Sequence, residues 1–281
     1  MTVKIVTDTM ADIPDNLAQE LGITVVPAYV RFGEDVYRDR VEITTEKFYH
    51  RLVHDATFPA TTQAPPGDFV DVYTKLAKET DEILVVNMSG KLSGTYQSAL
   101  QAKGMIEEKC RIEVIDSETV IMSLGMIVIT VAKAAQAGAN LGSLADMARR
   151  AIPRSHVVML FDTLKYLAKG GRIGKAKELM GSLLSVKQIL TIKDGEVAPL
   201  TRRRSLSAGM DYLYEFVAGF THIEGLAVEH ATTPDELDKL AERLGSLFPA
   251  ERIYKSTVSP VLGAHGGPGC LSVSVLEAVD D

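Results

Sequence analysis

The sequence has very little cysteine and no long apolar run. Its two cysteines, Cys110 and Cys270, lack a CxxC spacing and are too few for a disulfide framework, which is typical of a reducing compartment. We expect both thiols to be buried. The stretch most like a membrane span, 120–131, has about a dozen residues, whereas a bilayer needs roughly 20. The N-terminus also lacks a signal-peptide pattern, so we expect a cytoplasmic protein without stable membrane insertion.

Positive charge is scarce as well. The 281 residues include 30 Lys and Arg against 37 Asp and Glu, which gives a net charge of −7. Such a chain as a whole repels a phosphate backbone, so we expect no nucleic acid partner. With 46% hydrophobic and 24% charged residues the composition is that of a globular protein. The length is sufficient for two ordinary domains.

No nucleotide-binding motif is complete. The segment GGRIGKA at 170–176 resembles a phosphate-binding loop, but Lys169 stands where that loop has its first glycine, and Ala176 replaces the residue whose hydroxyl binds Mg²⁺. Asp8-Thr9-Met10 follows the first expected strand in place of a GxGxxG turn. We therefore expect no ATP or dinucleotide cofactor in this chain.

Catalytic and metal motifs are incomplete in the same way. His50 and His54 have the spacing of a zinc pair on a helix, but Arg51 occupies the position of the zincin glutamate, so an exposed helix face is the better interpretation. Ser93 lacks the flanking glycines of a nucleophile elbow. We expect no metal and assign no catalytic residue.

The first half alternates short apolar runs with amphipathic stretches. Strands are expected at 3–6, 23–30, 82–86 and 111–115. Pro14 opens and Gly22 closes the first expected helix, and Thr44 is the expected N-cap of a helix that runs to His54. This alternation predicts an α/β domain with a mainly parallel sheet flanked by helices.

The second half has a different pattern. Strands are expected at 156–161, 223–229, 251–255 and 270–276, together with a hairpin over 188–200. Asp194-Gly195 is a strong signal for the turn of that hairpin, and another helix is expected to begin near Pro234. An antiparallel pair within an α/β pattern predicts a second domain with a mixed sheet. We place the two domains at 1–152 and 153–281.

Hydroxyl groups gather in two turn-rich segments. Thr61 and Thr62 precede Pro65-Pro66, and Ser93 follows an expected strand just before a helix. A hydroxyl at a helix start can bind an anion at the positive end of the helix dipole. It can equally be an N-cap, and the residue pattern alone favours capping.

Basic side chains occur in three further segments. His265 lies in the glycine-rich stretch 263–269, which favours either exposure at a pocket rim or a tight turn. Arg172 follows two glycines. Arg202 and Arg203 follow an expected strand, where neighbouring side chains point to opposite faces. On an acidic protein such groups suggest a docking or phosphate-facing patch, although a solvated face is the ordinary interpretation.

Four segments resemble motifs of a known family and occur in the same order from end to end. They are IVTDTMADIP at 5–14, MSGKLSGTYQSA at 88–99, LKYLAKGGRIGKA at 164–176 and PVLGAHGGPG at 260–269. Each resembles a motif of the DegV family of bacterial fatty-acid-binding proteins, and the resemblance covers nearly the whole chain. Ala64 and Gln188 stand where the family commonly has proline, so the backbone near residue 188, and with it the shape of the acyl pocket, is expected to differ.

The resemblance implies a fold and a function. The fold is two α/β domains that hold a long-chain fatty acid in a buried tunnel between them, with no other cofactor. The function is that of a carrier, not catalytic alone, which presents the carboxylate to a separate ATP-dependent fatty acid kinase subunit. The product would be acyl phosphate for phospholipid synthesis.

The resemblance also implies residue roles. By motif position Thr61 and Ser93 would hydrogen-bond the carboxylate, with Thr62 and His265 close by. The arginines would contact phosphate or the kinase; they are Arg172, Arg202 and Arg203.

Two apolar helical stretches are candidates for the tunnel wall. Met122, Gly125 and Met126 supply flexible thioethers and a gap in the first stretch, and Leu183 lies in the second. Their pattern alone predicts core helices, whereas the resemblance implies core on one face and acyl wall on the other. At about 0.8 kcal/mol for each buried methylene, the tail would supply most of the affinity.

Two other functions remain open at this point. A self-contained phosphotransferase would carry a phosphoryl group on His265, which its glycine-rich surroundings permit. A non-enzymatic lipid sensor would use the same pocket without supporting a kinase.

Overall fold

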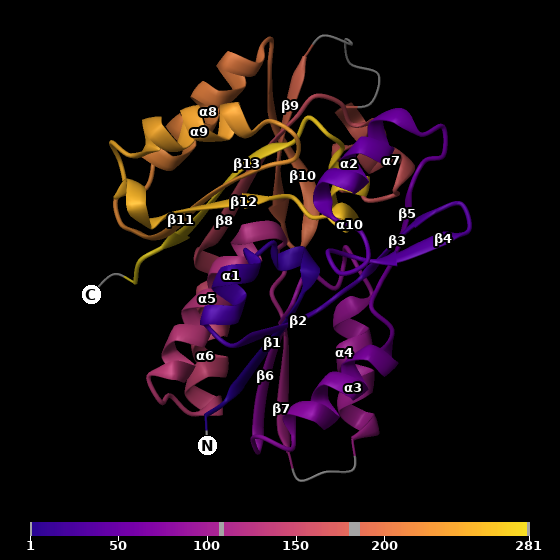
Figure 1. Cartoon of the computed structure of the whole chain (residues 1–281). Helices are drawn as coiled ribbons and strands as arrows, with labels where there is room; N and C mark the ends of the chain where they lie inside the picture. Colours follow the sequence, from indigo (N-terminus) through magenta and orange to yellow (C-terminus); the bar gives the residue numbers. More distant parts are fainter. Residues whose placement is uncertain (1, 107–109, 180–185, 280–281) are drawn as a thin grey trace.

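The computed structural model describes residues 2–106, 110–179 and 186–279. Its first half contains a four-stranded sheet in the order β2-β1-β6-β7 (Figure 1). The strands are β1 (Lys4–Asp8), β2 (Ile23–Val26), β6 (Glu82–Asn87) and β7 (Arg111–Asp116). Every pairing among them is parallel, which confirms the parallel sheet expected from the alternating pattern.

Helices cover both faces of this sheet (Figure 1). One face carries α1 (Asp15–Glu20), α5 (Ile121–Gln136) and α6 (Leu141–Ala151), and the other carries α3 (Pro66–Leu76) and α4 (Thr95–Met105). Strand side chains alternate between the two faces as the pleat requires: Ile5 packs towards α5, whereas Val6 packs towards α3. Both faces of the sheet are therefore buried.

A small antiparallel sheet corrects one expectation. The run at 23–30 is not a single strand, because β2 ends at Val26 and β3 (Tyr29–Phe32) joins a separate sheet in the order β4-β3-β5. Its partners are β4 (Asp35–Arg38) and β5 (Ala60–Thr62). Pro27 lies between the two strands and has no N–H to donate to a ladder, so the chain leaves the first sheet there.

The second half forms a six-stranded mixed sheet in the order β10-β9-β8-β13-β11-β12. The strands are β8 (Ser155–Phe161), β9 (Lys187–Lys193), β10 (Glu196–Arg203), β11 (Ile223–His230), β12 (Ile253–Thr257) and β13 (Leu271–Glu277). Only β11 and β12 pair in parallel, so the expected mixed sheet is confirmed. The two large sheets draw their strands from 4–116 and from 155–277, and the division at 152 and 153 stays a prediction.

The hairpin turn behaves as its sequence predicts. Asp194 and Gly195 have φ angles of 54° and 75°, and two positive values are the signature of the type I′ turn that matches strand twist. β9 and β10 pair on either side of it. The turn residues thus set the register of this hairpin.

The remaining helices lie on the second sheet and near the boundary between the two halves of the chain. Helices α8 (Leu206–Ala218) and α9 (Pro234–Leu244) cover its outer face. Near the small antiparallel sheet lie α2 (Thr45–His54), α7 (Lys165–Lys169) and α10 (Pro260–Gly266). The predicted cap of α2 is confirmed, because Thr44 Oγ1 accepts the amide of Lys47 at 3.2 Å. Short 3-10 turns complete the chain: η1 (Thr9–Ala11), η2 (Ile152–Arg154), η3 (Gly174–Leu179) and η4 (Ala250–Arg252).

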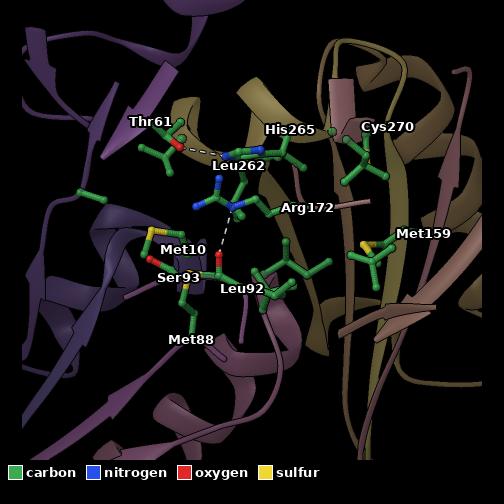
Figure 2. Close-up of a pocket in the computed structure, with 18 of the residues that line it drawn as sticks. Met10, Thr61, Met88, Leu92, Ser93, Met159, Arg172, Leu262, His265 and Cys270 are labelled. Carbon is green, nitrogen blue, oxygen red and sulfur yellow. Dashed lines mark hydrogen bonds between the residues drawn. The ribbon is translucent and has the colours of Figure 1, made fainter. Parts of the chain in front are cut away.

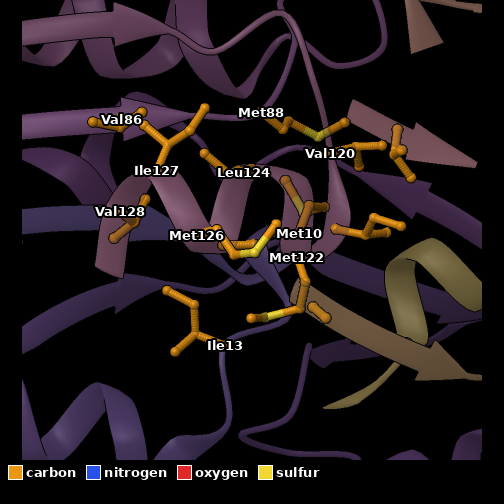
Figure 3. Packing of buried hydrophobic residues seen from close by; sticks show 14 of the residues in the cluster. Met10, Ile13, Val86, Met88, Val120, Met122, Leu124, Met126, Ile127 and Val128 are labelled. Atoms are coloured by element: carbon orange, nitrogen blue, oxygen red, sulfur yellow. The ribbon is translucent and has the colours of Figure 1, made fainter. Parts of the chain in front are cut away.

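Helix α5 lies between the two large sheets, and this explains its composition. Apolar side chains leave it on nearly every side and pack against η1 and the ends of β6 (Figure 3). A helix that is hydrophobic all round is a buried helix. Gly125 is needed there, because a Cβ at this position would come within 2.5 Å of the Ala11 carbonyl oxygen. Within the described ranges no helix, α5 included, is long and apolar enough to cross a bilayer.

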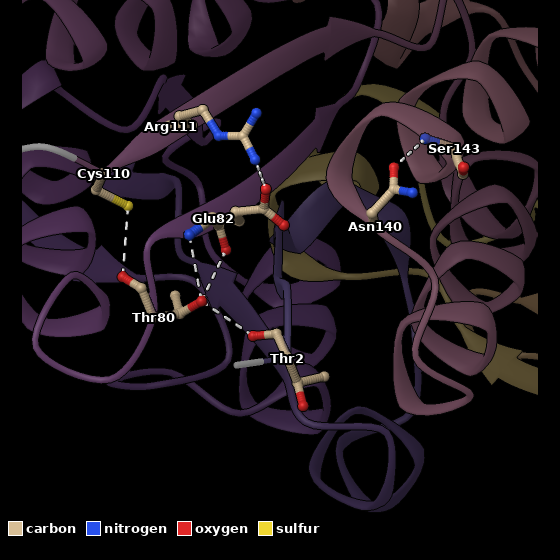
Figure 4. A network of polar contacts seen from close by, with 7 residues as sticks. All are labelled: Thr2, Thr80, Glu82, Cys110, Arg111, Asn140 and Ser143. Carbon is tan, nitrogen blue, oxygen red and sulfur yellow. Dashed lines mark hydrogen bonds and ion pairs between the residues drawn. The ribbon is translucent and has the colours of Figure 1, made fainter.

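Polar contacts secure the far end of the first sheet (Figure 4). Thr80 Oγ1 donates to the Thr2 carbonyl at 3.0 Å and accepts the Glu82 amide at 3.2 Å, which ties the starts of β1 and β6 together. The half-buried thiol of Cys110 donates to the Thr80 carbonyl at 3.7 Å. Asn140 caps α6 through the amide of Ser143 at 3.0 Å. These contacts lie at the end of the sheet opposite the candidate site described below.

Candidate ligand-binding site

A cavity lies between the two halves of the molecule, at the carboxyl ends of β1 and β6 (Figure 2). Its atom-free volume, with the open mouth included, is about 1030 Å³. Its apolar walls come from Met10, Ala28, Met88, Val120, Ile121, Met159, Phe161, Leu167, Ile192, Val197, Val258, Val261, Leu262 and Cys270. Its polar lining residues are Thr61, Thr62, Gln63, Ser93, Arg172 and His265. Thr61, Ser93, Arg172 and His265 lie together at one end of the cavity (Figure 2).

At the polar end, Thr61 from the first half of the chain contacts His265 from the second half. Thr61 lies on β5, where it pairs with Val30 of β3, and His265 lies in the last turn of α10. Thr61 Oγ1 and His265 Nε2 are 2.9 Å apart (Figure 2). Gly170 makes room for the ring, since a Cβ there would lie 2.1 Å from Nδ1. Residues 204 positions apart in sequence thus form one contact.

The imidazole of His265 is neutral at physiological pH. Burial, and secondly the nearby Arg172 charge, lower the pKa of His265 from 6.5 to about 4. Its Nδ1 atom is buried and has no hydrogen-bond partner among the described residues. A buried N–H without an acceptor is costly, so the proton belongs on Nε2, which donates it to Thr61. The hydroxyl proton of Thr61 is then left for a ligand.

Ser93 supplies the second hydroxyl at this end, from the loop that opens α4. Its Oγ accepts the Thr95 amide at 3.3 Å and lies 2.9 Å from Thr95 Oγ1. Ser93 therefore does bind a helix-start amide, as the capping interpretation held, although Gly94 is the N-cap residue. The same residue also lines the cavity, so the two interpretations are not alternatives.

The capping interpretation of Thr61 and Thr62 is wrong. The N-cap of α3 is Pro65, and both threonines lie in β5 instead. A strand pairing with β3 takes this segment away from the helix start, and the short link of residues 63–65 separates the two. Tertiary pairing has overridden the local signal here.

The arginines divide into two groups. Arg172 lies at the cavity mouth, where its Nε donates to the Leu92 carbonyl at 3.2 Å (Figure 2). Arg202 is exposed on β10, and Arg203 stacks on the Tyr212 ring with its guanidinium carbon 4.7 Å from the ring centre. Neither of these two is among the described residues that line the cavity.

The residues of α5 that were predicted to line an acyl tunnel do not line this cavity. Of the described residues that line the cavity, none is Met122, Gly125 or Met126. Met122 is fully buried in the core, and Met126 faces a separate depression beside Gly225. Helix α5 is enclosed by both sheets, so it has no face left for the cavity beyond its first residue, Ile121. Leu183 lies outside the described residues.

Sequence reasoning missed the methionines that do line the cavity. Met10 follows β1 and Met88 follows β6, so both stand at carboxyl ends of neighbouring parallel strands. Ligands of open α/β sheets bind at such ends. That rule, applied to the expected strands, would have found both residues. Met159, within β8, has no such signal.

The hairpin turn contacts the loop after β6, which carries Ser93. Ser89 Oγ donates to the Gly195 carbonyl and Lys91 Nζ donates to the Asp194 carbonyl, both at 2.7 Å. These two contacts join the loop after β6 to the other half of the molecule. An apolar cavity that ends in hydroxyl groups and a neutral imidazole, with Arg172 at its mouth, fits an elongated apolar ligand with a small polar head.

Comparison with known proteins gives the family. A family model described as "Uncharacterised protein, DegV family" matches residues 2–278. A DegV domain-containing protein of Caldanaerobacter subterraneus subsp. tengcongensis is 34% identical over 274 residues, which cover 96% of this chain and 97% of that protein. The chain belongs to the DegV family.

Solved structures agree with this assignment. A DegV family protein from Thermus thermophilus, described for its fatty acid binding, matches with a TM-score of 0.91 and 31% identity, covering 99% of this chain and 100% of that one. DegV from Bacillus subtilis, described as a fatty acid binding protein, matches with a TM-score of 0.90 and 27% identity, with the same coverage. The expected two-domain α/β architecture is that of these neighbours.

Proposed function

We propose that this chain binds a long-chain fatty acid in the cavity and presents the carboxylate to a separate ATP-dependent fatty acid kinase subunit, which forms acyl phosphate for phospholipid synthesis in the cytoplasm. The observation that carries the proposal is the cavity itself, apolar along its walls and hydroxyl-lined at one end. The fatty acid binding described for the Thermus thermophilus and Bacillus subtilis proteins supports it.

The walls account for affinity. Each methylene that leaves water for an apolar wall contributes about 0.8 kcal/mol, so a tail of about fifteen contributes roughly 12 kcal/mol before the costs of ordering it. The thioethers of Met10, Met88 and Met159 adapt to a flexible chain without leaving gaps. A bound tail of this kind needs no charged group to hold it.

The polar end accounts for orientation. Thr61 and Ser93 offer hydroxyl protons, and the neutral His265 fixes the hydroxyl of Thr61. Neutral donors bind a carboxylate less strongly than a buried Arg or Lys would, which leaves the carboxylate less stabilised before it reacts. Arg172, at the mouth, would be the first cation that an incoming phosphoryl group meets. Arg202 and Arg203 lie on β10, in the hairpin of β9 and β10, and would contact the kinase.

Native mass spectrometry of the purified protein, followed by organic extraction, tests the binding step. We expect a copurified acyl chain, or a thermal shift on adding oleate to the extracted protein. If neither is seen, the proposed function fails. Adding the cognate kinase and ATP then tests presentation: acyl phosphate formation supports the carrier role, and its absence with normal binding favours a lipid sensor.

The phosphotransferase alternative has weaker support. The Nε2 atom of His265 is engaged by Thr61, and Nδ1 is buried, so neither nitrogen is open to a phosphoryl donor. Labelled phosphoenolpyruvate or ATP, added to the protein alone and analysed at alkaline pH, tests it. We expect no label on the protein.

A further inference from the structure

Three carboxyl groups are buried together behind the cavity wall, outside the site described above. Asp12, Asp39 and Glu229 all have no exposed surface. Asp12 and Asp39 come from the first half of the chain and Glu229 comes from β11. Buried carboxyl groups are costly when charged, so their contacts need a reason.

Two of these carboxyl groups hold the first turn of α10. Asp12 Oδ1 accepts the amide of Ser259, the N-cap residue of α10, at 3.1 Å, and Asp39 Oδ2 accepts the amide of Val261 at 3.4 Å. Both contacts cross from one half of the molecule to the other. His265 lies one turn later, in the last turn of α10, so these two amides set where the imidazole meets Thr61.

The third carboxyl group of the cluster is that of Glu229. Glu229 accepts the amide of Met122 at 3.2 Å and the hydroxyl of Ser272 at 3.2 Å. Burial, and next the neighbouring carboxyl group of Asp12, raise the pKa of Glu229 well above the ordinary value. Two carboxyl groups held this close in a buried site do not readily ionise together, which favours the protonated form of one of them.

Two oxygens of the cluster favour the neutral acid. Asp12 Oδ2 and Asp39 Oδ1 are buried without a hydrogen-bond partner among the described residues. A buried carboxylate with an unpaired oxygen costs more in its charged form than as the neutral acid. Burial raises the pKa of both Asp12 and Asp39 from 3.8 to about 7, with the charge of Asp12 as a second cause for Asp39.

Few charges nearby could compensate ionisation. Arg40 is the cation that lowers the pKa of both aspartates, and it already binds Asp15 and the Ile13 carbonyl. The other titratable groups that face the cluster are Asp8 on β1, Tyr49 on α2 and Cys270 before β13. Three ionised carboxylates beside one shared cation would repel one another.

We propose that Asp12 and Asp39 are positioning residues for the polar end of the cavity, which hold the first turn of α10 only while the cluster with Glu229 keeps its protons. Above neutral pH the ionised groups separate, α10 shifts, and His265 leaves Thr61. The part of this proposal that concerns the ligand rests on the proposed function. A bound fatty acid is then released more readily as the pH rises.

The ligand-free readout is the ring signal of His265 in isotope-labelled protein, assigned by its loss in His265→Asn. Because the pKa of His265 is lowered to about 4, its own titration lies outside the window between pH 6 and 8. We expect a step in its chemical shift within that window in the wild type. Asp39→Asn keeps an acceptor for the Val261 amide but cannot ionise, so the step shrinks. Asp39→Leu, which removes the acceptor, displaces the signal at every pH.

The ligand readout is oleate affinity over the same range. One linked proton weakens binding by up to about tenfold for each pH unit above 7, and Asp39→Asn flattens that slope, while the surface control Asp211→Asn keeps it. A wild type without the His265 step, or an Asp39→Asn protein with an unchanged step, overturns the proposal even if fatty acid binds. A wild type that shows the step but binds no fatty acid overturns the proposed function alone.

Discussion

The two ends of the cavity are built in opposite ways. Its walls consist of interchangeable apolar side chains drawn from both halves of the molecule, among them three methionines. Its polar end depends on a few groups in fixed geometry, with Thr61 and His265 paired at 2.9 Å. The walls can therefore tolerate exchange of one apolar residue for another, whereas the polar end cannot lose a single donor without leaving its partner unpaired. Affinity therefore depends on many wall residues, whereas orientation of the ligand depends on the few groups of the polar end.

The largest expected effect concerns the burial of His265 at the polar end and its contribution to stability as the pH changes. The pKa of His265 is lowered from 6.5 to about 4, chiefly by burial. His265 thus contributes its full stability above pH 6.5, and up to about 3 kcal/mol is lost as the pH falls from 6.5 to 4. Urea unfolding at pH 7 and pH 4.5 should show that His265→Asn loses less stability on acidification than the wild type. The raised pKa values of Asp12 and Asp39 act in the opposite direction in both proteins and cancel; equal losses would mean that the imidazole is not buried.

The next effect tests the walls. Ala28→Phe adds a ring to the cavity and should displace about three methylenes of the tail, which weakens fatty acid binding by roughly 60-fold. Titration with a fluorescent fatty acid measures this. Ala218→Phe, on the exposed face of α8, is the matched control and should bind normally. Unchanged affinity in Ala28→Phe would place the tail somewhere other than this cavity.

A smaller effect separates hydroxyl chemistry from shape at the polar end. Thr61→Val removes the hydroxyl at nearly constant volume and should weaken fatty acid binding about fivefold, the value of one hydrogen bond of about 1 kcal/mol. Thr61→Ser keeps the hydroxyl and should restore most of the affinity. The carboxyl chemical shift of a fatty acid labelled at its first carbon should move in the valine variant only. A shift that is equal in both variants would argue against contact between Thr61 and the carboxylate.

The smallest effect concerns the contact between the hairpin turn and the loop after β6, which carries Ser93. Lys91→Met removes the exposed contact with the Asp194 carbonyl, and we expect the ligand to dissociate about threefold faster, since exposed contacts contribute less than about 1 kcal/mol. Stopped-flow displacement measures the rate. Lys103→Met, an exposed change on α4, should leave it unaltered. A rate that does not change would mean that the ligand leaves by another side of the cavity.

Local patterns in the sequence predicted most of the secondary structure. Thr44 caps α2, Asp194 and Gly195 form the turn between β9 and β10, and the alternation of apolar runs indicates the parallel sheet. These features depend on neighbours in sequence, so residue chemistry is sufficient for them. The split of the run at 23–30 was missed, although Pro27 was the signal for it.

The site was less accessible to sequence reasoning. Ser93, Thr61 and His265 were found as candidates, but residue chemistry left capping as the better explanation for the hydroxyls. Thr61 is not a cap because β5 pairs with β3, which is a contact between segments about 30 residues apart. Met122, Gly125 and Met126 do not line this cavity for a similar reason, because no helical pattern shows that a second sheet will cover the remaining face of α5.

The sequence by itself determined the alternation of elements, the turn and cap positions and the four motifs, because each depends on residues that are close in the chain. Only the tertiary structure decided which hydroxyls face a cavity, that Met159 lines it, and that three carboxyl groups lie together behind α10. These depend on segments that meet across the boundary between two sheets. Burial there changes the chemistry of the same side chains, most clearly for His265 and Asp39, whose pKa values move in opposite directions because burial disfavours a charge of either sign.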